Sequence, residues 1–145
     1  KKYPFHSALN SSAEEADFSF SGIKTAVVNL MHNAAQKGET LSKADIAASF
    51  QRAVCDTLTL KAVHAAKEHG FNTLALAGGV SANRALRSSL ARACEEQGIR
   101  FCCPDFRYCT DNAAMIACAG HYALMAGELS GLDLNAAPEL PLVQR

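Results

Sequence analysis

The residues with the clearest chemical potential are two adjacent glycines, Gly78 and Gly79, which follow a short apolar run at residues 73–77. Glycine lets an anionic group approach the backbone without meeting a Cβ atom. A helix capped by Ser81 is expected just beyond, and a helix start offers free N–H groups and partial positive charge. Asn83 lies in its first turn, where it could hydrogen-bond a ribose or a phosphate. The pattern predicts a nucleotide-phosphate site; the alternative is a tight strand-to-helix turn without a ligand.

Two further segments place polar residues at expected helix starts. In the segment 109–115, Asp111 could bind a metal ion or simply cap the helix. Ser21 and Gly22, followed by Lys24, could touch a phosphate or form an ordinary cap beside an exposed lysine. Helix starts that follow neighbouring parallel strands face one crevice in an open α/β sheet. The segment 109–115 and the glycine pair are therefore expected to border the same ligand.

Other kinds of chemistry have less support. The sequence contains neither an H-x-x-x-H pair nor a G-x-S-x-G elbow, so a self-contained metal site or a serine nucleophile is not predicted. The glycine pair matches neither G-x-x-x-x-G-K-[ST] nor G-x-G-x-x-G. The six cysteines include no C-x-x-C and are interpreted as reduced, small core residues, with a metal or redox role as the alternative. Five scattered arginines could touch RNA phosphates or be ordinary solvated surface: Arg84, Arg87, Arg92, Arg100 and Arg107.

These segments need a scaffold, which the sequence predicts to be α/β. Helical spacing of apolar residues and capping signals predict helices over 21–33, 43–69 and 82–97, and a last one to about 126 capped by Thr110 or Asp111. Ser42 is the expected N-cap of the long helix and Gly70 its C′ glycine. Strands are predicted at 73–77, buried on both faces of a parallel sheet, and at 99–103. This order favours a right-handed crossover.

Only two strands are evident, and an open parallel sheet normally has more. We therefore expect the chain to lack strands that another segment supplies. An unpaired sheet edge would invite a homodimer. Residues 1–17 are interpreted as an irregular lead-in, 18–127 as the folded subdomain and 128–145 as a tail.

Composition narrows the classes of partner. The 145 residues carry 14 Lys and Arg and 14 Asp and Glu, so no long-range field directs the chain toward RNA or an anionic membrane. No apolar run reaches the roughly 20 residues that a membrane helix needs. No secretory signal follows Lys1, and the missing initial methionine suggests a cut or processed chain. A cytoplasmic protein without membrane contact is expected.

Taken together, the motifs resemble one family closely. Residues 18–27 are similar to its F-S-F-S-G-[LI]-K-T-A-V stretch, and residues 77–87 to its A-G-G-V-[SA]-A-N-x-x-L-R. Residues 109–116 are similar to its C-T-D-N-[GA]-A-M-I, and residues 45–51 match a fourth, weaker stretch. The family is TsaD, the tRNA threonylcarbamoyladenosine transferases, once called O-sialoglycoprotein endopeptidases. The likeness covers about residues 18–127 in the right order.

The resemblance implies an actin-like, hexokinase-like ATPase fold of the ribonuclease H-like class. It implies transfer of threonylcarbamoyl from threonylcarbamoyl-AMP to N6 of the adenosine beside the anticodon, in tRNAs that read ANN codons. By position, Gly78 and Gly79 would line the phosphates of an adenine nucleotide, Asn83 would contact that nucleotide, and Ser21 and Gly22 would border it.

The resemblance also implies a cofactor and partners. Asp111 would be one ligand of an iron or zinc ion, whose other ligands are a His-x-x-x-His pair in the family's N-terminal half. Because that pair and the N-terminal phosphate loop are absent, the chain is interpreted as a C-terminal part that is inactive alone. The bacterial partner proteins would be TsaB, a catalytically inactive paralogue, and TsaE, an ATPase.

Two other classes of function stay open at this stage. Carbamoyltransferases and sugar or acetate kinases with actin-like domains also place Gly-Gly at a strand end, although a kinase needs a catalytic carboxylate and phosphate loops not evident here. A non-catalytic nucleotide-binding module is the second alternative. The adenylate is an activated mixed anhydride, so transfer to tRNA requires no protein nucleophile. Backbone N–H groups can orient it and stabilise developing charge.

Overall fold

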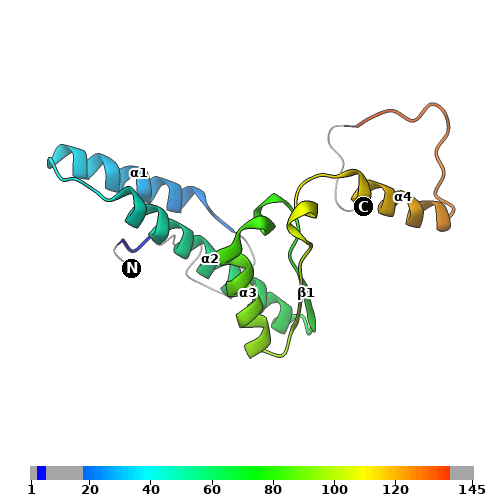
Figure 1. Ribbon diagram of the computed structural model, residues 1–145, viewed down its shortest axis with the longest axis horizontal. Coiled ribbons are helices and arrows are strands. Elements are labelled where there is room, and N and C mark those ends of the chain that lie inside the picture. Colours follow the sequence, from blue (N-terminus) through cyan, green and yellow to red (C-terminus); the bar gives the residue numbers. More distant parts are fainter. Residues whose placement is uncertain (1–2, 6–17, 138–145) are drawn as a thin grey trace. The chain divides into compact units, whose positions relative to one another are not determined.

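The computed structural model describes residues 3–5 and 18–137 (Figure 1), and the chain divides into two compact units with the boundary between Thr110 and Asp111. The described part is helix-rich with a small parallel sheet, so the predicted α/β class is confirmed. The predicted lead-in lies almost entirely outside the described residues.

The first unit begins with two helices, α1 (Ser21–Gln36) and α2 (Lys43–Glu68), which pack together through Ile23 and Ile46. Ser42 is the N-cap of α2, as predicted, and its hydroxyl accepts the Asp45 N–H at 3.2 Å. The predicted cap at Ser21–Gly22 is wrong. Phe20 occupies the N-cap position of α1, where its carbonyl accepts the Lys24 N–H at 3.0 Å, but its side chain carries no oxygen or nitrogen that could cap the helix.

The end of α2 directs the chain into the sheet. Gly70 has φ +69°, and its N–H donates to the Lys67 carbonyl while the Phe71 N–H donates to the Ala66 carbonyl at 2.7 Å. These paired bonds form a Schellman motif and confirm the prediction of a C′ glycine. The turn reverses the chain directly into the first strand.

The sheet consists of β1 (Thr73–Ala75) and β2 (Arg100–Cys102), which pair in parallel with Leu74 opposite Phe101. The helix α3 (Arg84–Glu96) connects them, and α2 and α3 bury Leu86, Leu90 and Cys55 against Leu74 and Phe101. The prediction that the first strand is buried on both faces is wrong for the described residues. Thr73 and Ala75 are exposed, since these helices contact only the face that carries Leu74.

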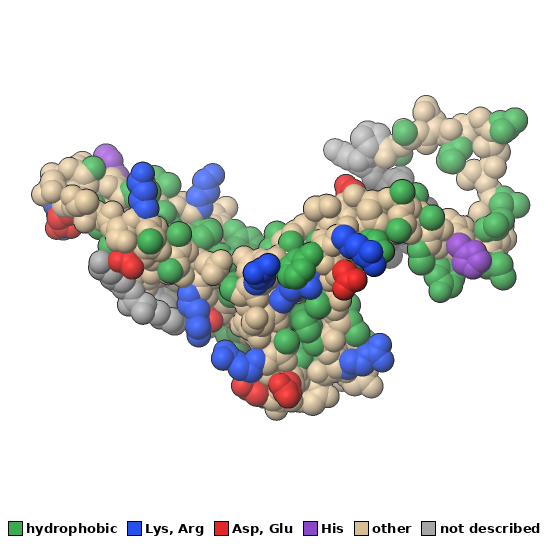
Figure 2. Space-filling model, viewed as in Figure 1, with side chains coloured by type: hydrophobic (Ala, Val, Ile, Leu, Met, Phe, Trp, Pro, Cys, Tyr) green, Lys and Arg blue, Asp and Glu red, His purple; other side chains and the backbone are tan. Residues whose placement is uncertain are grey.

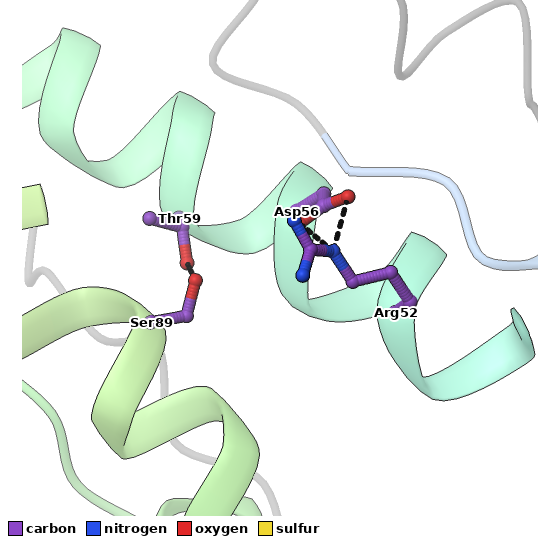
Figure 3. Close-up of polar contacts among 4 residues, drawn as sticks. All are labelled: Arg52, Asp56, Thr59 and Ser89. Carbon is purple, nitrogen blue, oxygen red and sulfur yellow. Dashed lines mark hydrogen bonds and ion pairs between the residues drawn. The ribbon is translucent and has the colours of Figure 1, made fainter. Parts of the chain in front are cut away.

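The contact between α2 and α3 also has a polar side (Figure 3). The Thr59 hydroxyl of α2 donates to the Ser89 hydroxyl of α3 at 3.0 Å. In the preceding two turns of α2, Arg52 pairs with Asp56 at 2.8 Å. This ion pair is solvent-facing, so its contribution to stability is small.

The second unit contains α4 (Ala113–Met125), whose residues are almost all exposed within the described part of the chain. Asn112 caps it, because its Oδ1 accepts the Met115 N–H at 3.0 Å, so the predicted cap at Thr110 or Asp111 is wrong. Residues 126–137 form no helix or strand. Among the described residues, no helix combines the length and the apolar character that crossing a membrane would require.

Candidate functional site

The turn that follows β1 is built around one conformationally demanding glycine. Gly78 has φ +85° and ψ 173°, a region that essentially only glycine occupies. Its carbonyl accepts the Ser81 N–H at 2.9 Å, which closes the short 3₁₀ turn η2 (Gly79–Ala82). We call residues 78–83 the glycine turn.

Gly79 differs from its neighbour. Its φ is not positive, and a Cβ atom built on it would meet nothing within 4 Å. Neither backbone strain nor packing within the described residues therefore demands glycine at this position. An open backbone at the carboxyl end of a parallel strand is what a phosphate group can approach.

Asn83 has a structural role that the sequence analysis did not assign. Its Oδ1 accepts the Leu86 N–H at 3.1 Å, so Asn83 is the N-cap of α3. The predicted cap Ser81 instead lies inside η2 with 0% exposure, and its hydroxyl has no hydrogen-bond partner among the described residues. Because η2 takes up residues 79–82, α3 begins two residues later than predicted. The chain enters α3 directly from the glycine turn, so the first N–H groups of α3, which lack intrahelical acceptors, lie next to it.

Arg87 connects the glycine turn with the loop that follows β2. Its Nε donates to the Ser81 carbonyl, and one terminal nitrogen donates to the Pro104 carbonyl, each at 2.5 Å. The same terminal nitrogen lies 3.0 Å from the Cys109 sulfur, and the other 3.5 Å from Cys103. One guanidinium therefore fixes the spacing between the two strand ends. Arg87 was predicted to touch an RNA phosphate or to be solvated surface, and it also ends the motif at residues 77–87; its position shortly after the glycine pair was the signal for a structural role.

The loop after β2 carries aromatic and positively charged side chains. It contains the 3₁₀ turn η3 (Phe106–Tyr108), in which both aromatic rings are exposed. The Arg87 guanidinium lies 4.2 Å from the Phe106 ring centroid, and that of Arg107 lies 4.6 Å from the Tyr108 centroid. Figure 2 shows Lys and Arg side chains beside hydrophobic ones over the region of α3 and the strands. This loop is suited to planar and anionic groups.

The remaining predicted site residues lie in different places. Ser21 and Gly22 are exposed in the first turn of α1. The preceding Phe20 lines an apolar cavity of about 550 Å³, and so does Val80 of the glycine turn. The structure thus brings the segment before α1 and the glycine turn to one cavity, although neither Ser21 nor Gly22 lines it. Asp111 is the first residue of the second unit and is exposed.

A metal ion implied by the resemblance would need more ligands than this part of the chain offers. Within residues 3–5 and 18–137, no group of three His, Cys, Asp or Glu side chains could hold a metal ion. Asp111 could supply one carboxylate, so the described residues do not form a metal site by themselves. Burial raises the pKa of the Cys55 and Cys94 thiols, which disfavours their thiolate forms as ligands.

Comparison with known proteins identifies the family. The profile described as "TsaD: tRNA N6-adenosine threonylcarbamoyltransferase" matches residues 1–118. The chain belongs to the TsaD family. This match spans the segment before α1, the glycine turn and the start of α4, the three places where the motifs lie.

Curated relatives of this TsaD-family chain carry the same description. A tRNA N6-adenosine threonylcarbamoyltransferase from Caldicellulosiruptor saccharolyticus is 46% identical over 144 residues, which cover 99% of this chain and 41% of the relative. One from Geobacillus thermodenitrificans is 52% identical over 128 residues, or 88% of this chain and 37% of the relative. The Staphylococcus aureus protein is 47% identical over 126 residues, or 87% and 37%. The chain thus spans about two-fifths of the length of these relatives.

Proposed function

We propose that the chain is part of an enzyme that transfers threonylcarbamoyl from threonylcarbamoyl-AMP to N6 of the adenosine beside the anticodon of tRNA. The observation that carries this proposal is the glycine turn in a chain of this family. Gly79 leaves an open backbone at a strand end, beside the free N–H groups at the start of α3. An actin-like fold for the whole protein, with nucleotide in its crevice, is part of the proposal.

In this reaction the chain orients an already activated substrate. The N6 amine attacks the carbamoyl carbon of the mixed anhydride, and a C–N bond forms. The bond from that carbon to the phosphate oxygen breaks, AMP leaves, and the amine loses a proton. Backbone N–H groups of the glycine turn and of the α3 start would face the phosphate, where negative charge increases as AMP leaves.

The roles of the other predicted site residues are parts of the same proposal. Gly78 shapes the turn, while Gly79 admits the phosphate. The Oδ1 atom of Asn83 caps α3, so only the side-chain NH₂ group of Asn83 would be available to contact the nucleotide. Ser21 and Gly22 would border the ligand from the start of α1.

A metal ion would be iron or zinc, with Asp111 as one ligand and the others from elsewhere in the complete protein. The ion would supply Lewis acidity toward the adenylate when bound. Partnership with TsaB and TsaE, a homodimer and a cytoplasmic location also stay proposals.

The direct test is nucleoside analysis of a tRNA transcript that reads ANN codons, after incubation with the complete protein of this gene and threonylcarbamoyl-AMP. We expect threonylcarbamoyladenosine in the digest. Asp111→Ala should lower metal content and product together, while Asp111→Glu should retain part of both. A complete protein that binds nucleotide without turnover would support a binding module instead, and one that phosphorylates a small sugar would support a kinase.

A further inference from the structure

The turn η3 presents an unusual aromatic surface. Phe106 is 52% exposed and Tyr108 is 42% exposed, and they are separated by Arg107. Large aromatic side chains contribute most to stability when they are buried. The two exposed rings on this turn, at the carboxyl end of β2, therefore contribute little to the stability of the core, but they are accessible to a partner.

The Phe106 ring is held from one side by a fixed cation. The Arg87 guanidinium lies 4.2 Å from the ring centroid and is itself anchored to the carbonyls of Ser81 and Pro104. A guanidinium with those acceptors has little freedom to leave the ring. The ring consequently has a fixed orientation before any ligand binds, which reduces the entropy lost on stacking.

Positive charge surrounds the same turn. Arg84 lies 5.8 Å from the Phe106 centroid, and Arg107 projects from the turn with 72% of its side chain exposed. Asp105 forms an ion pair with Arg107 at 3.8 Å, but both side chains are exposed to solvent, so the contact is weak. Aromatic rings interleaved with arginines are the pattern by which proteins bind single-stranded nucleic acid, with bases on the rings and phosphates on the cations.

We infer that Phe106, oriented by Arg87, is a stacking platform for an unpaired base of the RNA substrate. The inference rests on the proposed function, because it assigns part of the tRNA contact of the same site. The adenine of the nucleotide is the less suitable occupant. Nucleotide bases are usually bound in enclosing pockets, whereas Phe106 is 52% exposed on a turn and does not line the apolar cavity that Phe20 and Val80 share.

The test compares Phe106→Leu and Phe106→Trp in the complete protein, with Phe50→Leu as the matched control. Phe50 is 39% exposed in the first half of α2, outside both strand-end segments. Phe106→Leu should raise KM for tRNA about tenfold to a hundredfold, while KM for threonylcarbamoyl-AMP stays unchanged. Phe106→Trp should retain the wild-type KM, because a larger ring still stacks. Phe50→Leu should change neither constant.

A binding measurement keeps the inference testable if the complete protein proves inactive. An RNA hairpin with 2-aminopurine in its unpaired loop should lose fluorescence on binding the wild-type protein and Phe106→Trp, but much less on binding Phe106→Leu. Arg107→Gln should reduce the slope of log affinity against log salt concentration by about one, as expected for the loss of one phosphate contact. Equal quenching by wild type and Phe106→Leu would overturn the inference. A Phe106→Leu protein in which KM rises for the adenylate but not for tRNA would also overturn the inference. Absence of modified adenosine with normal quenching would overturn the proposed function and leave the platform intact.

Discussion

The two strand ends of this sheet carry segments that are stabilised in opposite ways. After β1, the backbone itself sets the shape, since Gly78 adopts a conformation reserved for glycine and a carbonyl–amide bond closes the turn. After β2, side chains set the shape, since Arg87 binds the Pro104 carbonyl and the Cys109 sulfur and packs on Phe106. The first segment offers bare backbone, and the second offers rings and cations.

This difference matches the two kinds of ligand that the proposed reaction requires. A phosphate is best held by several N–H groups at short range, which a Cβ atom would obstruct. A nucleobase is best held by a flat, apolar side chain beside positive charge. Arg87 belongs to both segments because it also binds the Ser81 carbonyl of the glycine turn. Changes confined to one segment should therefore affect one ligand, whereas changes at Arg87 should affect both.

The largest effect is expected for Gly79→Ala in the complete protein. The new methyl group would occupy the open space in front of the turn and displace the phosphate, so kcat/KM for the adenylate should fall about a hundredfold. The unfolding free energy should stay within a few tenths of a kcal/mol, since the φ of Gly79 suits alanine. Gly120→Ala in α4, another open position, is the control for a glycine without a ligand. A Gly79→Ala protein with the kcat/KM of the wild type would contradict the proposal that the phosphate approaches the backbone at Gly79.

Gly78→Ala should show the reverse pattern, with stability affected first. Its φ of +85° and ψ of 173° should cost an alanine about 1–3 kcal/mol, measurable by urea denaturation. Gly98 provides the comparison, because its φ of +67° lies in the left-handed region that asparagine tolerates. Gly98→Asn should therefore be mild and Gly78→Asn severe. Similar losses for both asparagine variants would show that the turn relaxes and that backbone strain does not define it.

The sequence predicted the ends of helices better where a second local signal supported the capping residue. Ser42 is followed three residues later by the acidic Asp45, and Gly70 follows the last residues of the long helical pattern; both predictions are confirmed. At the starts of α3 and α4, Ser81 and Asn83, or Thr110 and Asn112, are all good capping types close together. The choice depends on the 3₁₀ turn and on contacts from outside the helix, which local sequence does not contain.

The same limit applies to the candidate site. The glycine pair was evident because its signal is local, a strand followed by two glycines and a helix. The role of Arg87 was not, since its acceptors at Ser81, Pro104 and Cys109 come from two loops that only the folded sheet brings together. The uncovered face of β1 likewise reflects which partners are present rather than the apolar character of the strand.

Asn83 can separate capping from ligand contact. Asn83→Ala should cost about 1 kcal/mol of stability, because the Leu86 N–H loses its acceptor. Asn83→Asp keeps an acceptor oxygen, so stability should be retained, while its negative charge beside the phosphate should weaken nucleotide binding by several-fold. Urea denaturation and nucleotide titration of both variants measure the two effects independently. Unchanged nucleotide affinity in Asn83→Asp would limit Asn83 to its role as a cap.

The smallest effect concerns thiols away from both strand-end segments. Burial raises the pKa of Cys55 and Cys94 above the ordinary value of 9.0, so folding favours their neutral forms. The stability they contribute is complete below that value and is lost as pH rises through their folded pKa values, because the unfolded thiols ionise first. Replacing Cys94 with alanine should cost a small amount of stability at neutral pH and flatten the alkaline decline measured by urea denaturation, so the cost should shrink as pH rises. At about pH 8, iodoacetamide should label the exposed Cys103 and Cys118 first and Cys55 and Cys94 last. Rapid labelling of Cys94 would mean that α3 opens from the sheet, and the fixed spacing that Arg87 imposes on the two strand ends would then not hold.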